Sequence, residues 1–533
     1  MGLSETLNRR SFLQYAAGAA AATALPVTPP AQRAPAPPPR APQAFELEEA
    51  TIASLQDGLR AGRYTTRSLC EAYLARIEAL DRSGPTLRAV LETNPDALVI
   101  ADRLDAERKA GRRGTTRGPL YGIPVLIKDN IATEDRMMTT AGSLALVGAT
   151  PARDALVAER LRAAGAVLLG KTNLTEWANF RGNQSSSGWS GRGGQCRNPY
   201  ALDRNPCGSS SGTGAAIAAN FAAVGVGTET DGSIVCPSSA CSLVGVKPTL
   251  GLIGGAGIIP IAHSQDTAGP MCRTVSDAAI LLGVLAAKDF SASLDPNGLK
   301  GARIGVARKK CFGYSPEADA LVEAAIDVLR RQGATIVDPA DIPHLGDYDD
   351  SEFIVLLYEF KADLNAYLAD WTPRGPMHTL ADIIAFNEAN KTLELQYFGQ
   401  EIFTQAQEKG PLTDKVYLDA LEKNHRLSRT EGLDVVFAQN NLDAIIAPTG
   451  SPPWPTDLVN GDHFLGASST PGAVAGYPSV SVPVGYSFGL PVGMSFIGRG
   501  STEATLLKLA YAYEQAAKPR RPPRFLPTAD LSL

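Results

Sequence analysis

The chain has 533 residues, of which 44% are hydrophobic and 20% are charged, which supports a large globular core and excludes a wholly disordered chain. The formal net charge is −5, and the interspersed acidic and basic residues form no stripe for binding nucleic acid. Only five histidines occur, without a metal-ligand spacing, and there is no Cys-x-x-Cys. We therefore expect no metal and no other cofactor.

Residues 1–44 have the composition of an export signal. Arg9-Arg10 precedes an alanine-rich apolar stretch, 15–25, which is too short to span a membrane. Eight prolines follow within 26–42 and are typical of an extended spacer. The pattern predicts a twin-arginine signal, with the mature protein periplasmic or secreted. A frayed amphipathic helix is the alternative.

The seven cysteines are an odd number, so they cannot all pair within one chain. Twin-arginine export carries proteins that have already folded in the reducing cytoplasm. We therefore expect mostly free, buried thiols. A disulfide formed late, among the cysteines from Cys196 to Cys272, is the alternative.

Helical and strand patterns alternate along residues 45–533, the predicted folded part. Helical segments repeat apolar residues every three to four positions, and short apolar runs predict buried strands. The helices are expected at two places within 45–83 and over 97–109, 157–164, 213–223, from 234 onward, 318–331 and 503–516. The strands are expected over 123–127, 166–169, 224–228, 302–307, 334–337, 444–447, 480–484 and 492–497.

This alternation predicts an α/β fold, a single domain with a central mixed β-sheet covered by helices on both faces. Helical spacing replaces the alternation over about 340–440, which predicts a mostly helical cap insertion. Because similar strands lie on both sides of the insertion, we interpret 45–533 as one domain. No later apolar run approaches the roughly 18 residues of a membrane span, so no stable membrane insertion is expected.

Two Gly/Ser clusters, 207–214 and 227–233, lie inside this pattern. Alanine-rich helix and apolar strand adjoin both of them without a gap, so they are predicted to be turns in a packed core and not linkers. The second cluster leads from a strand into a helix expected to begin near Ser233. A serine at such a helix start can attack a carbonyl while neighbouring N–H groups hold the oxyanion. A simple N-cap is the alternative.

Several motifs occur in a fixed order along the chain. They are GPLYGIPVLIKDN at 118–130, GSSSG at 208–212, GSI at 232–234, GVKPT at 245–249, QDTAGP at 265–270 and GLPVG at 489–493. In these motifs the chain resembles the amidase signature family of Ser-cisSer-Lys amide hydrolases, over roughly residues 45–517.

The resemblance implies that Ser233 is the nucleophile, Ser209 a bridging serine on a cis peptide bond, and Lys128 the base. The implied oxyanion hole consists of the backbone N–H groups of Thr230, Asp231, Gly232 and Ser233. The chain departs from the family pattern at Asp231, where glycine is frequent, and at Glu229, where aspartate is frequent. Neither change removes a backbone N–H group, although Asp231 would narrow the pocket or change its charge.

A lysine base must be uncharged, but the ordinary pKa of lysine is about 10.4. Lys128 follows an apolar run that would carry it into a buried region, and burial lowers the pKa of an amine. Ser209 would then pass the proton of Ser233 to Lys128, and water would later release the acid from an acyl-enzyme. This chemistry needs no histidine. The alternative for Lys128 is a strand-end lysine paired with Asp129.

Three segments, 197–204, 228–237 and 357–361, most resemble bacterial peptide amidases. This implies hydrolysis of the C-terminal amide of peptides to a carboxylate and ammonia, without nucleic acid or an obligate partner subunit. Segment 173–180 corresponds to a pocket-lining segment in relatives, so Trp177 and Asn179 are the predicted substrate contacts. Core packing is the alternative for Trp177.

Other functions remain to be compared with this one. An amidase or esterase of the same family would act on small aryl or aliphatic amides. A tRNA-dependent amidotransferase subunit is disfavoured by the export signal, and an inactive binding protein by the presence of all three catalytic residues. A Ser-x-x-Lys mechanism of the penicillin-binding type is excluded, because Lys128 lies far upstream of both serines.

Overall fold

The computed structural model describes residues 45–111 and 118–532. The chain divides into two units, Met1–Glu46 and Leu47–Leu533, and the second unit contains the folded domain. The predicted signal and the proline-rich spacer, 1–44, lie outside the described residues. Among the residues that are described, no helix is long and apolar enough to cross a membrane.

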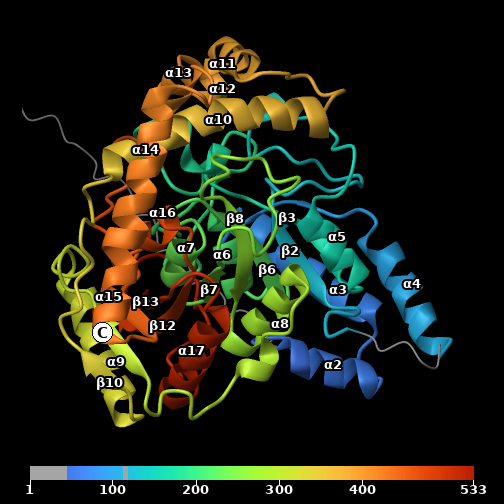
Figure 1. Cartoon of the computed structure of the whole chain (residues 1–533). Coiled ribbons are helices and arrows are strands. Elements are labelled where there is room, and N and C mark those ends of the chain that lie inside the picture. Colours follow the sequence, from blue (N-terminus) through green and yellow to red (C-terminus); the bar gives the residue numbers. More distant parts are fainter. Residues whose placement is uncertain (1–44, 112–117, 533) are drawn as a thin grey trace, which may run out of the picture. The chain divides into compact units, whose positions relative to one another are not determined.

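An eleven-stranded mixed sheet forms the centre of the second unit (Figure 1). In spatial order its strands are β1 (Val90–Thr93), β3 (Val167–Thr172), β2 (Pro124–Lys128), β6 (Val224–Glu229), β8 (Thr267–Cys272), β7 (Val244–Lys247), β12 (Ser479–Ser487), β13 (Leu490–Ile497), β11 (Ala444–Pro448), β9 (Arg303–Val306) and β10 (Thr335–Val337). Strand β2 runs parallel to β3 and β6, and β9 runs parallel to β10 and β11. The other neighbours are antiparallel.

Helices cover this sheet, and every residue of β2, β3 and β6 is buried as a result. Helices α5, α8, α17 and α9 pack in succession beside the strands, and α6 packs against α7. The helices outside the cap are α2 (Ile52–Arg60), α3 (Thr66–Ile77), α4 (Ala97–Lys109), α5 (Leu156–Ala163), α6 (Ser211–Ala218), α7 (Val235–Ala240), α8 (Val275–Ala286), α9 (Pro316–Arg331), α16 (Thr470–Val474) and α17 (Glu503–Ala517). The predicted α/β fold with a mixed central sheet is confirmed.

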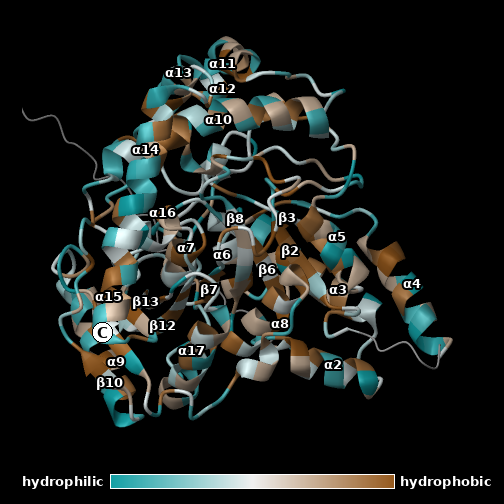
Figure 2. Cartoon of the chain, in the orientation of Figure 1, coloured by the Kyte–Doolittle hydropathy of each residue, from teal (hydrophilic) through white to brown (hydrophobic). Residues whose placement is uncertain are grey.

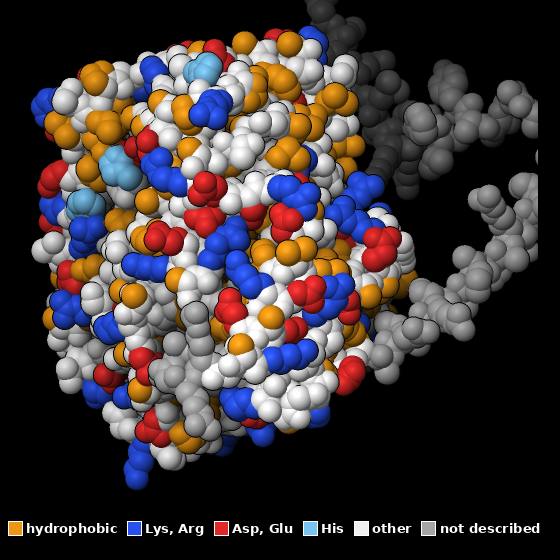
Figure 3. All heavy atoms as spheres, turned by 90° about the vertical axis from the view of Figure 1, so that its right-hand side faces the viewer, with side chains coloured by type: hydrophobic (Ala, Val, Ile, Leu, Met, Phe, Trp, Pro, Cys, Tyr) orange, Lys and Arg blue, Asp and Glu red, His pale blue; other side chains and the backbone are white. Residues whose placement is uncertain are grey.

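The chain between β10 and β11 is helical and forms the predicted cap insertion. Its helices are α10 (Asp349–Trp371), α11 (Leu380–Ala389), α12 (Lys391–Glu394), α13 (Glu401–Gln407), α14 (Lys415–His425), a π-helical turn (Arg426–Leu433) and α15 (Asp434–Asn440). Figure 2 shows hydrophobic ribbon in the central strands and a largely hydrophilic α14. On the face drawn in Figure 3, acidic and basic side chains are interspersed.

The structure differs from the predicted elements near the two Gly/Ser clusters. Helix α6 ends at Ala218 and not at residue 223, because Asn220 adopts a left-handed conformation (φ 61°) that terminates helices. Helix α7 begins only at Val235 and has six residues. Strand β8 was not expected, since its small residues and Pro270 have low strand propensity, but pairing with β6 and β7 overrides that preference.

Candidate active site

The candidate site lies where two neighbouring parallel strands end. Lys128 is the last residue of β2, and Thr228 is the next-to-last residue of β6. The strands are in register with Ile127 opposite Val226. The carboxyl ends of parallel strands meet at one edge of a sheet, which is where ligands bind in α/β folds.

Lys128 and Ser209 are in direct contact inside the protein. The Nζ atom of Lys128 donates to Ser209 Oγ at 2.8 Å and to Thr228 Oγ1 at 2.9 Å. Both Lys128 and Ser209 are fully buried, and Thr228 Oγ1 also accepts from Asn130 Nδ2 at 2.9 Å. The lysine is therefore fixed against a hydroxyl and forms no pair with Asp129, which was the structural alternative.

Burial lowers the pKa of Lys128 to about 7, although the nearby carboxylates of Asp266 and Glu229 act in the opposite direction. Near neutral pH a large fraction of this lysine is consequently uncharged. When charged, the amine donates a hydrogen bond to the Ser209 hydroxyl; when uncharged, it can accept a hydrogen from that hydroxyl across the same contact. The pair has the chemistry that a proton relay requires.

The turns that carry the two serines are bound to each other. The peptide bond between Gly208 and Ser209 is cis, and the backbone N–H of Ser210 donates to the carbonyl oxygen of Ser233 at 3.2 Å. Cys207 and Cys236, which flank these turns, form a disulfide. The structure thus brings Lys128, Ser209 and the turn of Ser233 together in one place.

The turn from 230 to 233 offers backbone donors. Gly232 has φ 77°, a conformation in which a side chain would be strained. In the part of the chain that the structure describes, the backbone N–H groups of this turn have no acceptor; they belong to Thr230, Asp231, Gly232 and Ser233. These are the predicted oxyanion donors.

The prediction that these donors belong to a helix N-terminus is wrong in one respect. The carboxylate of Glu229 accepts from the N–H groups of Ile234 at 2.7 Å and Val235 at 3.0 Å, so it already satisfies the start of α7. The available donors precede the helix and lie in the turn itself. Glu229 was noted in the sequence only as a departure from the family pattern, and the structure shows that it accepts hydrogen bonds at the start of α7.

A cavity of about 620 Å³ opens beside this turn. It is lined by residues from four segments, within 179–187, 207–208, 231–236 and 454–470. Asn179, a predicted substrate contact, is among them. The segment 454–470 contributes Trp454, Asp462 and Phe464, and no motif in the sequence marks these three residues.

Trp177 does not line this cavity, so its predicted substrate contact requires correction. Its side chain is only 2% exposed and packs edge-on against Phe403, with ring centroids 5.5 Å apart. Residues 177–179 all have positive φ values of 52°, 53° and 73°, and this left-handed turn separates the buried Trp177 from Asn179 at the cavity wall. Trp177 therefore belongs to the core, which was the alternative considered for it.

The thiols agree with the sequence expectation for five cysteines, which are free and buried. The disulfide between Cys207 and Cys236 lies within the range that was left open for a late bond. Both of its cysteines line the cavity, and the bond closes a loop that contains Ser209 and Ser233. It therefore tethers the two serine turns to each other.

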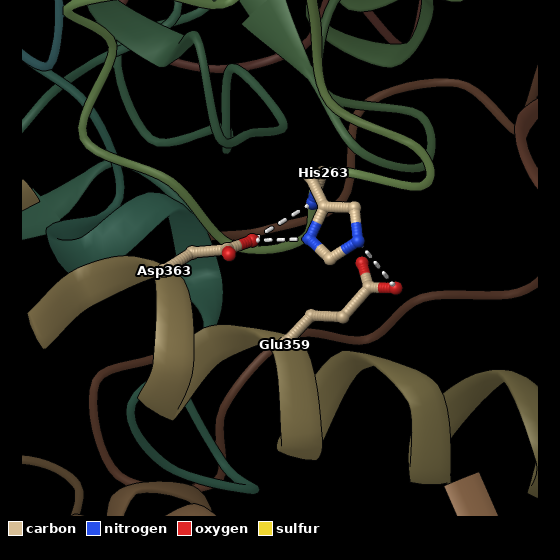
Figure 4. A group of neighbouring side chains, drawn as sticks. All are labelled: His263, Glu359 and Asp363. Atoms are coloured by element: carbon tan, nitrogen blue, oxygen red, sulfur yellow. Dashed lines mark hydrogen bonds and ion pairs between the residues drawn. The ribbon is translucent and has the colours of Figure 1, made fainter. Parts of the chain in front are cut away.

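A second cluster of titratable groups joins the loop before β8 to the cap (Figure 4). His263 Nδ1 lies 2.8 Å from Asp363 Oδ2, and His263 Nε2 lies 3.4 Å from Glu359 Oε1. Glu359 also accepts from the hydroxyl of Tyr417 at 2.8 Å and from Ser264 N at 2.9 Å. These three residues could offer a metal ion three ligand atoms, but each ring nitrogen already faces a carboxylate. The arrangement suits a protonated imidazole between two acids.

Replacing Cys207 and Cys236 together with serine is expected to lower the free energy of unfolding. A disulfide that spans 29 residues stabilises by about 3.5 kcal/mol in the chain-entropy model. Urea unfolding of the oxidised wild type and of the double variant measures the difference. Cys241→Ala serves as a control for the loss of a buried sulfur, and equal midpoints for the wild type and the double variant would contradict the prediction.

The contribution of His263 to stability is expected to disappear as pH rises. Asp363, followed by Glu359 and Asp266, raises the pKa of His263 against the effect of partial burial. A raised pKa stabilises the fold below the unfolded pKa of about 6.5, and the contribution is lost as pH passes through the folded value. His263→Gln should therefore lower the unfolding temperature at about pH 5.5 and much less at about pH 8.5. The effect is small, about 0.5 kcal/mol, because the ring is half exposed; an equal loss at both pH values would refute it.

Comparison with known proteins identifies the family. The Amidase family model matches residues 68–507, and the model of the twin-arginine translocation signal sequence matches residues 6–26, which confirms the predicted signal. A probable amidase of Arabidopsis thaliana is 42% identical over 506 residues, covering 90% of this chain and 93% of the relative.

Two solved structures are closely similar as well. The native peptide amidase of Stenotrophomonas maltophilia is 50% identical with a TM-score of 0.86, and the peptide amidase PAM in complex with the competitive inhibitor chymostatin is 50% identical with a TM-score of 0.87. Each covers 90% of this chain and 100% of its own. The chain therefore belongs to the amidase signature family and is an amidase, a hydrolase of amide bonds.

Proposed function

We propose that this amidase hydrolyses the C-terminal amide of peptides to a free carboxylate and ammonia, through an acyl-enzyme on Ser233. The observation that carries the mechanism is the 2.8 Å contact between Lys128 Nζ and Ser209 Oγ, buried beside the turn of Ser233. In this chain Lys128 is the base, Ser209 the relay and Ser233 the nucleophile. No histidine takes part.

The reaction proceeds by two transfers of the acyl group. As Ser233 Oγ attacks the carbonyl carbon, its proton passes to Ser209, and the proton of Ser209 passes to Lys128. The N–H groups of residues 230–233 hold the oxyanion; one such donor typically contributes 10²–10³-fold to kcat. The relay then runs in reverse, protonating the amine so that ammonia leaves, and a water molecule activated by the same relay releases the acid.

The size and the lining of the cavity support a peptide as the acyl part. The leaving group is only ammonia, so the bulk of the substrate must occupy the 620 Å³ cavity. Asn179, Asn183 and Gln184 contribute amide groups to its lining, and these groups can pair with a peptide backbone. Trp454 and Phe464 also line it; they pack edge to face with ring centroids 5.8 Å apart and offer an apolar surface for a side chain.

The similarity to peptide amidases, at 50% identity, supports the same substrate class. The signal at residues 6–26 supports export by the twin-arginine pathway to the periplasm or the medium, with 1–44 as the leader and 45–533 as the enzyme. We expect no nucleic acid and no obligate partner subunit. Small aryl or aliphatic amides are the alternative substrates, because the aromatic pair would also accept an aryl ring.

The substrate proposal is tested by mass spectrometry. After incubation, an amidated peptide should show the small mass change of amide-to-acid conversion, without internal cleavage, and should react with a kcat/KM at least about tenfold above that of a simple anilide. Ser233→Ala and Lys128→Ala should lose about 10⁴-fold or more in kcat, and Ser209→Ala should be strongly impaired.

Ser211→Ala is the matched control for these variants. Ser211 lies in the same cluster, but its hydroxyl has only long contacts, of 3.5 Å to Ser209 O and 3.4 Å to Thr175 Oγ1. It should keep most of the activity. Near-normal turnover by Ser233→Ala would contradict the proposed mechanism, and a clear preference for anilides would contradict the proposed substrate class.

The activity is also expected to fall at acidic pH. Burial sets the pKa of Lys128 to about 7, and only its uncharged form can accept the proton. Below about pH 7, kcat/KM should therefore decrease by about tenfold per pH unit, as expected for a single essential base. Initial rates across pH, with a stability control at each pH, give this profile; a flat profile down to about pH 5 would rule out a lysine base.

A further inference from the structure

The two carboxylates that line the cavity have different surroundings. Asp462 is saturated with donors: it accepts from Ser187 N at 3.0 Å and from the Ser187 hydroxyl, from Asn205 Nδ2 at 2.9 Å and from Trp454 Nε1 at 3.1 Å. These donors share the negative charge of Asp462, and the same hydrogen bonds hold its loop in place. No lysine or arginine lines the cavity in the described part of the chain, so the charge on Asp231 has no cation beside it there.

Asp231 has few partners. Its Oδ2 atom accepts from the hydroxyl of Thr470 at 2.7 Å, whereas no hydrogen-bond partner is found for its buried Oδ1 atom among the described residues. Burial raises the pKa of Asp231, and the charge of Asp349 acts in the same direction, whereas hydrogen bonds from Ser469 and Thr470 and the charge of Lys247 lower it. Neither Lys247 nor any other cation of the described residues forms an ion pair with Asp231. A cavity carboxylate that is not neutralised by the protein exerts its field on whatever occupies the cavity.

A second acidic residue, Glu352, interacts with Asp231 but is mostly uncharged at neutral pH. Glu352 is buried and accepts from Gln265 Nε2 at 2.8 Å. Burial, followed by the charge of Asp231, raises the pKa of Glu352 to about 8. At neutral pH Glu352 is consequently mostly protonated and adds little negative charge of its own beside Asp231.

The place of Asp231 in the chain brings this charge to the reacting end of a substrate. It is separated from Ser233 only by Gly232, and both it and Gly232 line the cavity. Two residues of extended chain span at most about 7 Å, so the Cα atoms of Asp231 and Ser233 are no farther apart than that, and Asp231 borders the cavity beside the turn of the nucleophile. At that distance an unscreened like charge weakens binding by roughly tenfold to a hundredfold.

We propose that Asp231 is a specificity-determining residue that excludes a carboxylate from the reacting position. A carboxamide is neutral and enters without penalty, whereas the acid that hydrolysis produces carries a negative charge and is repelled. The enzyme consequently takes neutral carboxamides, rejects peptides with a free C-terminal carboxylate, and releases its product rapidly. This inference rests on the proposed function and names the substrate class of the same site.

Binding measurements without turnover test this directly. In a Ser233→Ala background, isothermal titration calorimetry gives Kd for a peptide amide and for the peptide acid of the same sequence. With Asp231 present the amide should bind about tenfold to a hundredfold more tightly. Asp231→Asn should reduce this ratio by at least about tenfold, mainly through tighter binding of the acid, and Asp231→Glu should largely restore it.

Asp349→Asn is the matched control. It removes an exposed carboxylate from the same region without altering the lining of the cavity, so the ratio should stay as it is in the Ser233→Ala background. In enzyme that retains Ser233, the inhibition constant of the peptide acid should fall by about tenfold in Asp231→Asn, while the KM of the amide changes less. An unchanged ratio of amide to acid binding in a correctly folded Asp231→Asn variant would overturn the inference.

A second measurement avoids the variants altogether. The wild-type enzyme should be inhibited far more strongly by a neutral peptidyl alcohol than by the peptide acid of the same sequence, and equal inhibition would overturn the inference. If peptide amides are hydrolysed but acids bind as well as alcohols, only this inference fails. If no peptide amide is hydrolysed, the proposed function fails, and the inference fails with it.

Discussion

The buried contact between Lys128 and Ser209 is the constraint on which the rest of the site depends. An amine that is to accept a proton near neutral pH must be removed from water and kept from forming an ion pair. Asp266 and Glu229 are the carboxylates close enough to oppose this, but each already accepts from donors of its own: Asp266 from Ile261 N and Ala262 N, and Glu229 from the start of α7. Desolvation therefore prevails.

A small number of links holds the two serine turns in their relative positions. The turns of Ser209 and Ser233 come from different segments, before α6 and after β6, and their mutual position depends on few links. The hydrogen bond from Ser210 N to Ser233 O and the disulfide between Cys207 and Cys236 provide two of them. Because Glu229 accepts from the N–H groups of Ile234 and Val235 at the start of α7, these groups are satisfied within the protein, whereas the N–H groups of the preceding turn have no acceptor among the described residues.

Much of this could be predicted from the sequence, because the informative signals are local. The apolar run before Lys128 predicted a buried strand whose last residue is that lysine, and the Gly/Ser clusters marked both serine turns. Trp177, expected as a contact from the resemblance alone, lies in the core, because a left-handed turn over 177–179 separates it from the cavity, and such turns leave little trace in a sequence without glycine. Asp462 and Trp454 were missed because their role depends on a loop that folds back from far along the chain, beside residues around 187 and 205.

The charges on the two sides of Ser233 favour different steps of the reaction. In the proposed mechanism a neutral Lys128 on the inner side assists attack, whereas a charged Asp231 on the cavity side would oppose the oxyanion that develops nearby, since like charges repel. The N–H groups of the turn must offset that repulsion during the chemical step. A glycine in place of Asp231 would avoid the cost, so the carboxylate is best explained by the step in which the charge of the bound molecule changes, when a neutral amide has become an acid that has to leave.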